Sequence, residues 1–418
     1  MRQRSYYSAM KKIVTLIIAA LVFELSLFAQ LKKGDVSIKF YIQNDYYCAI
    51  VNRRNWDSPK TVILCAQKDL SIYELDNSIY EERTARIIYN AILGKIQPYL
   101  KNGDNVYFEP CGRIFFINLA ALMTPDGSRC CDLYHFFRLS DIRSFPDDPV
   151  KKKDFHPIFL LFGGMDYDAD PEAMNQHGWF CHTSDRQHLF NDIPGYTPGD
   201  LCFGYTSDGT RAGVSNLRES KGEIKFIFHL SYPFMKPYTG SEALEEVFRM
   251  EVRRNHDYIV HVSTHAFTIS SEIGSLRASS DVYKRCGFLF SGAGHTLNGK
   301  KLPFKLNDGI LYGEEIAQLD MTNCSLIVLG ACNTALGVVT DYGIIGIQSA
   351  LKRAGAHTIL MTLWSVNDRA TSEFMKYFYT HLIDGKSKHQ SLELARKALR
   401  NSKDFNDPLY WAPFIMLD

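Results

Sequence analysis

The second half of the chain alternates short apolar runs with longer segments in which apolar residues recur at helical spacing. The runs resemble strands that are buried on both faces of a sheet, and they cover residues 157–162, 224–230, 258–262, 326–330 and 358–363. The segments of helical spacing cover residues 242–253, 344–353, 370–383 and 392–399, and an aromatic run at 409–416 reads as a last strand. This alternation predicts an α/β fold with a mostly parallel sheet flanked by helices.

The first 156 residues follow another pattern. Residues 31–75 alternate in the manner of strands, and residues 78–100 have the spacing of a helix. Two short apolar runs, at 106–108 and 114–117, indicate a hairpin.

The N-terminus has the features of a secretory signal peptide. Lys11 and Lys12 precede an apolar stretch, which ends at Phe28 and Ala29 before the polar Gln30. The stretch is short of the roughly 20 apolar residues that a spanning helix needs. We therefore expect a periplasmic or secreted protein without a stable membrane span after cleavage. The predicted organisation is a signal peptide, a small β-rich segment, a helix with a hairpin and the α/β core, at residues 1–29, 30–77, 78–156 and 157–418.

Composition narrows the function classes. The chain has 418 residues, 46% of them hydrophobic and 22% charged, and a net charge of +1. Such a balance is typical of a globular protein and gives no electrostatic case for nucleic acid as a partner. The adjacent Cys130 and Cys131 have no second pair at zinc-site distance, and Gly163 with Gly164 lacks a phosphate-binding pattern. We expect no metal and no cofactor, and nothing in the sequence indicates calcium dependence.

Two of the predicted buried strands are followed by residues that can carry chemistry. His265 comes shortly after the run at 258–262, and Cys332 comes shortly after the run at 326–330. Neighbouring parallel strands would bring both residues to one edge of the sheet, where open α/β sheets place their ligands. A thiol needs a partner that accepts its proton, and imidazole does so near neutral pH. Each residue alone is more often structural, but the pair at matched strand ends indicates a nucleophile with its base.

Other histidines and cysteines fit this role less well. His261 lies inside an apolar run and is expected in the core, whereas His295 and Cys286 do not follow a buried strand. Cys324 precedes its strand and so stands at the opposite end.

Several segments around these residues resemble the successive motifs of CHAT domains, which are caspase-like cysteine peptidases related to separases and gingipains. The segments, in chain order, are VSTH at 262–265, LIVLGACNTALG at 326–337, GIIGIQSALKRAGA at 343–356, LWSVND at 363–368 and YWAPF at 410–414. The resemblance covers residues 157–418 and extends more loosely to 80–156. It implies a caspase–hemoglobinase fold and a protein or peptide substrate.

The resemblance also implies roles for individual residues. His265 would be the general base and acid, and Cys332 the acylated nucleophile. The backbone N–H groups of Ala266 and Cys332 would form the oxyanion hole, where one donor is typically worth roughly 3 kcal/mol of transition-state stabilisation. Ala266 stands where the family commonly has glycine.

Asp368 is similar in position to the acid that selects basic P1 residues in separase-like relatives. A carboxylate in a pocket binds arginine or lysine through charge-assisted hydrogen bonds. The alternative for Asp368 is an N-cap, because it precedes the helix predicted at 370–383. Trp364 and Ser365 would line the same cleft, although Trp364 could instead belong to the core.

Two long stretches, 166–222 and 277–305, have no sustained periodicity and are expected to be functional loops. If P1 is basic, their cationic residues are hypothetical self-processing points, namely Arg211, Arg218, Lys221, Arg277, Lys284 and Arg285.

The sequence thus predicts a cysteine endopeptidase with a His–Cys dyad, with basic P1 specificity as a further hypothesis. The alternative is a catalytically silent CHAT-fold scaffold that binds protein partners. A thiol transferase is a third interpretation, which the lack of a nucleotide or cofactor motif disfavours.

Overall fold

The structure is a computed structural model of the whole chain, and a defined part of it is described here. The described residues are 31–74, 77–143, 157–178, 217, 219–230, 235–254, 256–268, 272–273, 276–277, 282–303, 306–330, 337–340 and 343–418. The predicted signal peptide at 1–29 lies outside them.

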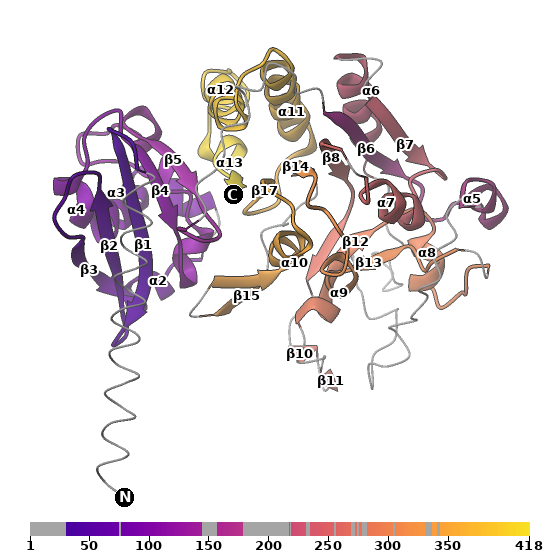
Figure 1. The fold of residues 1–418 in the computed structure, drawn as a ribbon, viewed down its shortest axis with the longest axis horizontal. Coiled ribbons are helices and arrows are strands. Elements are labelled where there is room, and N and C mark those ends of the chain that lie inside the picture. Colours follow the sequence, from indigo (N-terminus) through magenta and orange to yellow (C-terminus); the bar gives the residue numbers. More distant parts are fainter. Residues whose placement is uncertain are drawn as a thin grey trace, which may run out of the picture.

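One eleven-stranded sheet runs through the protein, in the order β3-β2-β1-β4-β5-β18-β17-β14-β8-β6-β7 (Figure 1). Its strands are β1 (Asp35–Gln43), β2 (Tyr46–Arg53), β3 (Lys60–Ala66), β4 (Asn105–Glu109), β5 (His135–Arg138), β6 (Ile158–Met165), β7 (Met235–Gly240), β8 (Tyr258–Ser263), β14 (Cys324–Leu329), β17 (Ile359–Thr362) and β18 (Phe414–Leu417). Only the pairs β3–β2, β2–β1 and β17–β18 are antiparallel. The mostly parallel α/β fold predicted from the sequence is therefore confirmed.

Helices cover both faces of the right-hand part of this sheet in Figure 1. On one face lie α6 (Ser220–Leu230), α11 (Asp368–Ile383) and α12 (Lys388–Arg400), which contact one another. On the other lie α7 (Glu245–Glu251), α9 (Gly313–Ile316) and α10 (Ile347–Ala354). Sheets covered on both sides need strands that are apolar on both sides, as β8 and β14 are throughout.

Aromatic rings of the helices pack against aromatic rings of the sheet. On the α11 face, Phe374 stacks on Phe414 of β18 with ring centroids 3.7 Å apart. On the opposite face, Phe248 of α7 meets Phe162 of β6 edge to face at 5.3 Å. All four rings are fully buried, so the packing places α7 and α11 firmly on opposite faces.

The N-terminal strands join the same sheet rather than forming one of their own. β1 pairs in parallel with β4, β4 with β5, and β5 meets β18 through Arg138 and Leu417. Arg138 is buried, and its guanidinium donates to the carbonyls of Phe115 and Ile117. The distance from Nη2 to the Ile117 carbonyl oxygen is 2.8 Å. Its charge is thus satisfied by main-chain carbonyls at the point where the two parts of the sheet meet.

The remaining elements are short and connect the strands. The α-helices are α2 (Gln67–Ser71), α3 (Glu82–Ala91), α4 (Leu93–Ile96), α5 (Pro171–Gly178), α8 (Ala293–Leu297) and α13 (Pro408–Trp411). The 3₁₀ turns are η1 (Asn77–Tyr80), η2 (Gln97–Tyr99), η3 (Gly112–Phe116), η4 (Leu119–Ala121), η5 (Cys130–Asp132) and η9 (Val282–Arg285). The small sheets comprise β9 (Ala266–Thr268) with β12 (Cys286–Leu289) and β13 (Ile310–Tyr312), β10 (Glu272–Ile273) with β11 (Leu276–Arg277), and β15 (Gly337–Thr340) with β16 (Gly343–Gly346).

Two predictions of secondary structure were wrong in kind. The run at 224–230 is not a strand but the second part of α6, whose buried residues Ser220, Glu223, Ile224 and Ile227 share one helical face. Its many β-formers suggested a strand, and packing on the sheet overrode that propensity. The predicted second hairpin strand at 114–117 is the 3₁₀ turn η3, and β4 pairs with β1 and β5 instead.

Three further predictions were right only in part. The helix expected at 344–353 begins at Ile347, because residues 343–346 form β16. The stretch at 277–305 is not irregular throughout, since it contains β12 and α8. The closing run at 409–416 is divided between α13 and β18.

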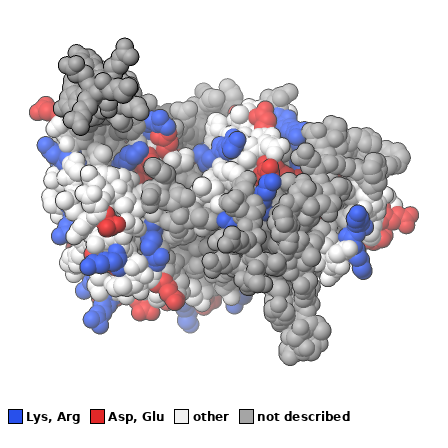
Figure 2. Space-filling model, turned by 90° about the horizontal axis from the view of Figure 1, so that it is seen from below, with Lys and Arg blue, Asp and Glu red and all other residues white. Residues whose placement is uncertain are grey.

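Within the part of the chain that the structure describes, no helix has the length and apolar character to cross a membrane. The seven cysteines described there, 48, 65, 111, 130, 131, 286 and 324, form no disulfide with one another. On the face shown in Figure 2, acidic and basic side chains are interspersed over the described surface.

A cluster of carboxylates lies between α7 and α9, around Arg249. The Arg249 Nη1 lies 3.2 Å from Glu245 Oε1 and 2.7 Å from Glu315 Oε1. Burial and, to a smaller extent, the neighbouring Glu315 raise the pKa of Asp308 to about 7. Burial likewise raises the pKa of Glu245 well above its ordinary value. One guanidinium therefore lies among carboxyl groups whose pKa values are raised.

This cluster makes stability depend on pH. Asp308 keeps its proton in the folded chain up to about pH 7, whereas in the unfolded chain it loses it near 3.8. The contribution of Asp308 to the free energy of unfolding is complete below pH 3.8 and is lost as pH rises through 7. The reason is that the folded state binds more protons than the unfolded state between these two pH values. We expect Asp308→Asn to flatten this dependence, measured as the free energy of unfolding in urea between pH 4 and 8. An unchanged slope would contradict the assignment, and the exposed Asp320→Asn is the control.

Candidate active site

The carboxyl ends of β8, β14 and β17 meet at one edge of the sheet. β14 pairs in parallel with β8, with Leu329 opposite Val262, and the Gly330 N–H donates to the Val262 carbonyl at 2.9 Å. His265 leaves β8 at this edge and is partly exposed. The structure thus brings the ends of the two predicted strands side by side.

His265 is held by Tyr167, which follows β6. The backbone N–H of His265 donates to the Tyr167 hydroxyl at 3.3 Å, and the two rings lie 5.4 Å apart. The same hydroxyl lies 3.0 Å from Thr264 Oγ1, which in turn donates to the Leu289 carbonyl. Burial raises the pKa of Tyr167, so this hydroxyl stays protonated. Tyr167 therefore helps to fix the backbone of His265, and its ring lies beside the imidazole.

Ala266 begins β9, the outer strand of a small sheet. The Leu289 N–H donates to the His265 carbonyl at 3.0 Å, and Ala266 stands opposite Phe288 in the antiparallel ladder. Hydrogen-bonded and non-hydrogen-bonded pairs alternate in such a ladder. The N–H of Ala266 consequently points away from β12, on the side where β9 has no further strand among the described residues.

Cys332 lies outside the described residues, which stop at Gly330 and resume at Gly337. Its proposed N–H donor is therefore outside them as well. Four of the described cysteines are poor nucleophiles, because burial raises their pKa. Burial raises the pKa of Cys65 to about 11 and of Cys324 to about 12, and it raises the pKa of Cys130 and Cys131 as well.

A small pocket opens beside the strand ends. Its lining comprises Leu217, Glu219, Ser220, Glu223, Ser263, Gly330, Thr362, Val366, Asp368 and Thr371. Three of these residues carry carboxylates, and the enclosed space is about 20 Å³, enough for roughly one water molecule. The pocket is therefore acidic and narrow.

Asp368 does not cap its helix. The N-cap of α11 is Asn367, whose side chain accepts from the backbone N–H of Arg369 at 3.0 Å and of Ala370 at 3.4 Å. Asp368 is exposed and lines the pocket. The N-cap interpretation of Asp368 is therefore wrong. Its neighbour Asn367, whose side chain suits an N-cap equally well, takes that position.

Glu223 is the buried carboxylate of the pocket lining. Its side chain is 5% exposed, and its Oε1 lies 2.6 Å from His261 Nε2, at an angle outside hydrogen-bond geometry. His261 is fully buried, as expected, and its Nδ1 lies 2.9 Å from the Tyr379 hydroxyl. A methyl group on Gly330 would stand 3.3 Å from Glu223 Oε1. The carboxylate therefore lies close to the residue that directly follows β14.

Trp364 and Ser365 do not line this pocket. Trp364 is 8% exposed, donates from Nε1 to the Leu409 carbonyl at 3.2 Å and lies 5.3 Å from the Tyr80 ring. Ser365 is exposed to solvent. His295 is held through Nε2, 3.0 Å from the Ala169 carbonyl, which suits a structural role.

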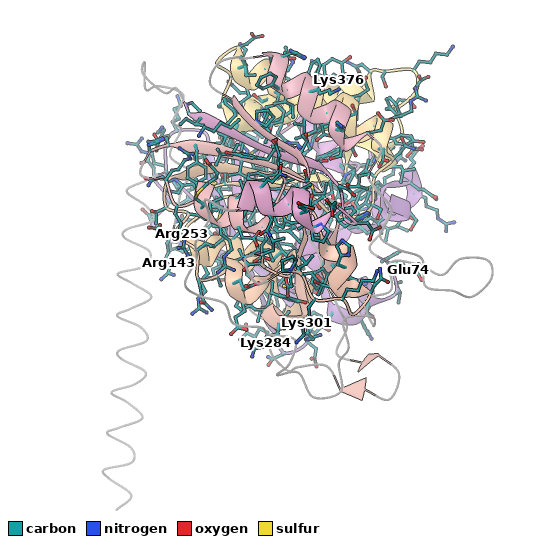
Figure 3. The ribbon with its side chains drawn as sticks, turned by 90° about the vertical axis from the view of Figure 1, so that its right-hand side faces the viewer. Glu74, Arg143, Arg253, Lys284, Lys301 and Lys376 are labelled. Atoms are coloured by element: carbon teal, nitrogen blue, oxygen red, sulfur yellow. The ribbon has the colours of Figure 1, made fainter. Side chains whose placement is uncertain are left out.

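The hypothetical processing points are mostly not in irregular loops. Lys221 belongs to α6, and Arg277 to β11. Lys284 and Arg285 form the end of η9, where Arg285 is 4% exposed and Lys284 lies at the periphery in Figure 3. Arg211 and Arg218 lie outside the described residues.

Sequence reasoning missed Tyr167, Glu219 and Glu223. Glu219 directly precedes α6 and Glu223 lies in its first turn, in a region where the sequence predicts a loop and a strand, and Tyr167 falls in a stretch without periodicity. The helical spacing of the buried positions in α6 was the available signal. Among the described residues, no group of three or more His, Cys, Asp or Glu side chains could hold a metal ion.

Comparison with known proteins identifies the family. The CHAT domain matches residues 82–417, well over half of the chain. The protein belongs to the CHAT-domain family.

Other similarities to this CHAT protein are partial. Tetratricopeptide repeat protein 28 from Homo sapiens is 31% identical over 112 residues, which are 27% of this chain and 4% of that protein. Its counterpart from Mus musculus is 36% identical over 92 residues, which are 22% of this chain and again 4% of the other. The chain thus matches only a small part of these long relatives. A crystal structure of the Arg-specific cysteine proteinase gingipain R is similar with a TM-score of 0.40 and 8% identity, over 80% of this chain and 66% of that one.

Proposed function

We propose that this CHAT protein is a cysteine endopeptidase in which His265 and Cys332 form the catalytic dyad. The observation that carries the proposal is the register of β8 and β14. Val262 stands opposite Leu329, and His265 and Cys332 each come three residues after that pair. The two residues thus follow neighbouring parallel strands at equal offsets in the sequence, which supports a site at this edge of the sheet.

In the proposed mechanism His265 accepts the thiol proton of Cys332, and the sulfur attacks the peptide carbonyl. The oxyanion accepts hydrogen bonds from the N–H groups of Ala266 and Cys332. His265 then gives its proton to the leaving amine, and the C–N bond breaks. His265 then takes a proton from water, which attacks the thioester. The C–S bond breaks, the carboxylic acid leaves, and His265 returns its proton to the thiolate. The outward direction of the Ala266 N–H supports its role as a donor.

The acidic pocket supports specificity for a basic P1 residue. Glu219, Glu223 and Asp368 line it next to Gly330, and a guanidinium or ammonium group would neutralise part of their charge. Because the space is about 20 Å³, a lysine or arginine side chain enters only if the pocket widens. Glu219 and Asp368 are exposed, so these two carboxylates can move more easily than the buried Glu223.

We further propose that the protein acts outside the cytosol, since the apolar N-terminal stretch with its basic flank has the form of a signal peptide. N-terminal sequencing of the protein from its native cells checks this, with a start near Gln30 as the expected result and a start at Met1 or Met10 as the contrary one.

A fluorogenic peptide library with a varied P1 residue tests the enzymatic proposal. Wild type is expected to cleave after arginine or lysine, with or without calcium or after limited proteolysis. The second candidate function is a catalytically silent scaffold for protein partners. If wild type cleaves no peptide under any of these conditions, the scaffold replaces the enzyme as the conclusion.

A further inference from the structure

A second hollow lies where the two parts of the sheet meet, away from the strand ends at His265. It is lined by Glu109, Pro110, Phe115, Leu139, Ser140, Ile344, Ile345, Gln348, Ser349, Lys352 and Leu417, and it encloses about 390 Å³. We call it the junction groove. β4, β5 and β18 are parallel neighbours, and their carboxyl ends supply Glu109, Leu139 and Leu417. Open α/β sheets bind ligands at such ends.

Gln348 is a buried residue of the junction groove whose side-chain amide has no hydrogen-bond partner among the described residues. It belongs to α10, is 1% exposed and lines the hollow. Neither its Oε1 nor its Nε2 has a hydrogen-bond partner among the residues that the structure describes. Leaving a buried amide without partners is unfavourable, so its donor and its acceptor are available for a bound molecule.

The other polar side chains of the lining are already engaged. Glu109 lies 3.2 Å from Lys39 Nζ and accepts from the Ile142 N–H, and Ser140 donates to the Asp418 carbonyl. Ser349 caps its own helix, and Lys352 donates to the His357 carbonyl at 2.7 Å. Gln348 is therefore the polar side chain of the lining for which no hydrogen bond is found among the described residues, and much of the remaining lining is apolar.

We propose that the junction groove binds an extended apolar peptide segment of a partner protein, whose main chain pairs with the Gln348 amide. A peptide unit carries one donor and one acceptor, which complement the two free positions of a glutamine side chain. Apolar side chains of the segment pack against Phe115, Leu139 and Ile344. The volume lies within the range of sites for small ligands and suits a few residues rather than a domain.

The groove also touches the element that follows the candidate nucleophile. Ile344 and Ile345 belong to β16, which pairs with β15, the first described strand after Cys332. A bound segment would therefore contact this hairpin. Binding itself does not require the proposed peptidase activity, so the two proposals can fail separately.

The test measures peptide binding by fluorescence polarisation to the full chain carrying Cys332→Ala, which prevents cleavage. The probes are labelled, end-capped tetrapeptides of Ala, Val, Leu and Phe. We expect some of them to bind, Gln348→Leu to weaken binding about tenfold or more, and N-methylation of one peptide nitrogen to do the same. Ile345→Glu, at the exposed rim, is expected to weaken binding without disturbing the core. Gln318→Leu, at an exposed position, is the matched control.

Thermal unfolding accompanies each variant. Gln348→Leu is expected to unfold at a higher temperature than wild type, because an apolar side chain replaces an unpartnered buried amide. The proposal is overturned if no tetrapeptide binds, if Gln348→Leu and Ile345→Glu bind like wild type, or if N-methylation has no effect. Binding that appears only after residues 144–156 are replaced by a Gly-Ser linker would assign the groove to this chain's own segment instead.

Discussion

Replacing Cys332 by alanine is expected to lower kcat/KM for peptide cleavage by at least about 10⁴-fold, because no acyl-enzyme can form. His265→Ala is expected to have an effect of similar size, since without the imidazole the thiol is mostly protonated near neutral pH. The two losses should not add in the double variant, because the residues act as a unit. The assay is cleavage of the best fluorogenic peptide, with folding verified by thermal unfolding.

The matched control for this experiment is Cys131→Ala. Cys131 is the one described cysteine that is partly exposed, and its thiol accepts from Arg400 Nη1 at 2.9 Å. The control should keep the activity of wild type. If Cys131→Ala abolishes cleavage while Cys332→Ala preserves it, the nucleophile is misassigned.

The second large effect concerns specificity. Asp368→Asn and Glu223→Gln are each expected to lower kcat/KM for peptides with P1 arginine by about 10–100-fold, the range for one charge-assisted hydrogen bond. Peptides with a neutral P1 residue should be affected far less, because the lost interaction is with the substrate's charge. The ratio of kcat/KM for P1 arginine and P1 leucine is the quantity to measure.

Asp384→Asn serves as the control, because this exposed aspartate stands at the other end of α11. Asp384→Asn removes one negative charge, as Asp368→Asn does, but Asp384 does not line the pocket. The ratio of kcat/KM for P1 arginine and P1 leucine should therefore equal that of wild type. An equal fall in cleavage of both peptides by Asp368→Asn would mean that the carboxylate supports the site generally and does not select P1. A preference of wild type for neutral P1 residues would dismiss the acidic pocket as the specificity site.

The strands of the core were predictable because each is a continuous apolar run that ends in glycine or polar residues. β6, β8, β14 and β17 all lie within a few residues of their predicted bounds. α6 was not predictable by the same criterion. Its residues Ile224, Phe226, Ile227 and Phe228 are strand formers, and only the sheet beneath it makes the helical face of Glu223, Ile224 and Ile227 the buried one.

The candidate site shows the same division. His265 was predictable because it follows a buried strand, and β8 places it as expected. Tyr167 was not, because it is 98 residues from His265 and meets it only through the adjacency of β6 and β8. The sequence left two interpretations of Asp368 open, an acid that selects P1 and an N-cap, and the hydrogen bonds of Asn367 show that Asn367 is the cap.

By itself, the sequence determined the main strands of the core and the family, and it supplied His265 and Cys332 as the candidates for base and nucleophile, since these depend on local periodicity and on motifs. Only the tertiary structure decided which residues surround them. It placed the carboxylates of α6 and α11 beside Gly330, and it left the Gln348 amide in the junction groove without a hydrogen-bond partner among the described residues. Such contacts join residues far apart in the chain, and they form only when strand order and helix packing bring those residues together.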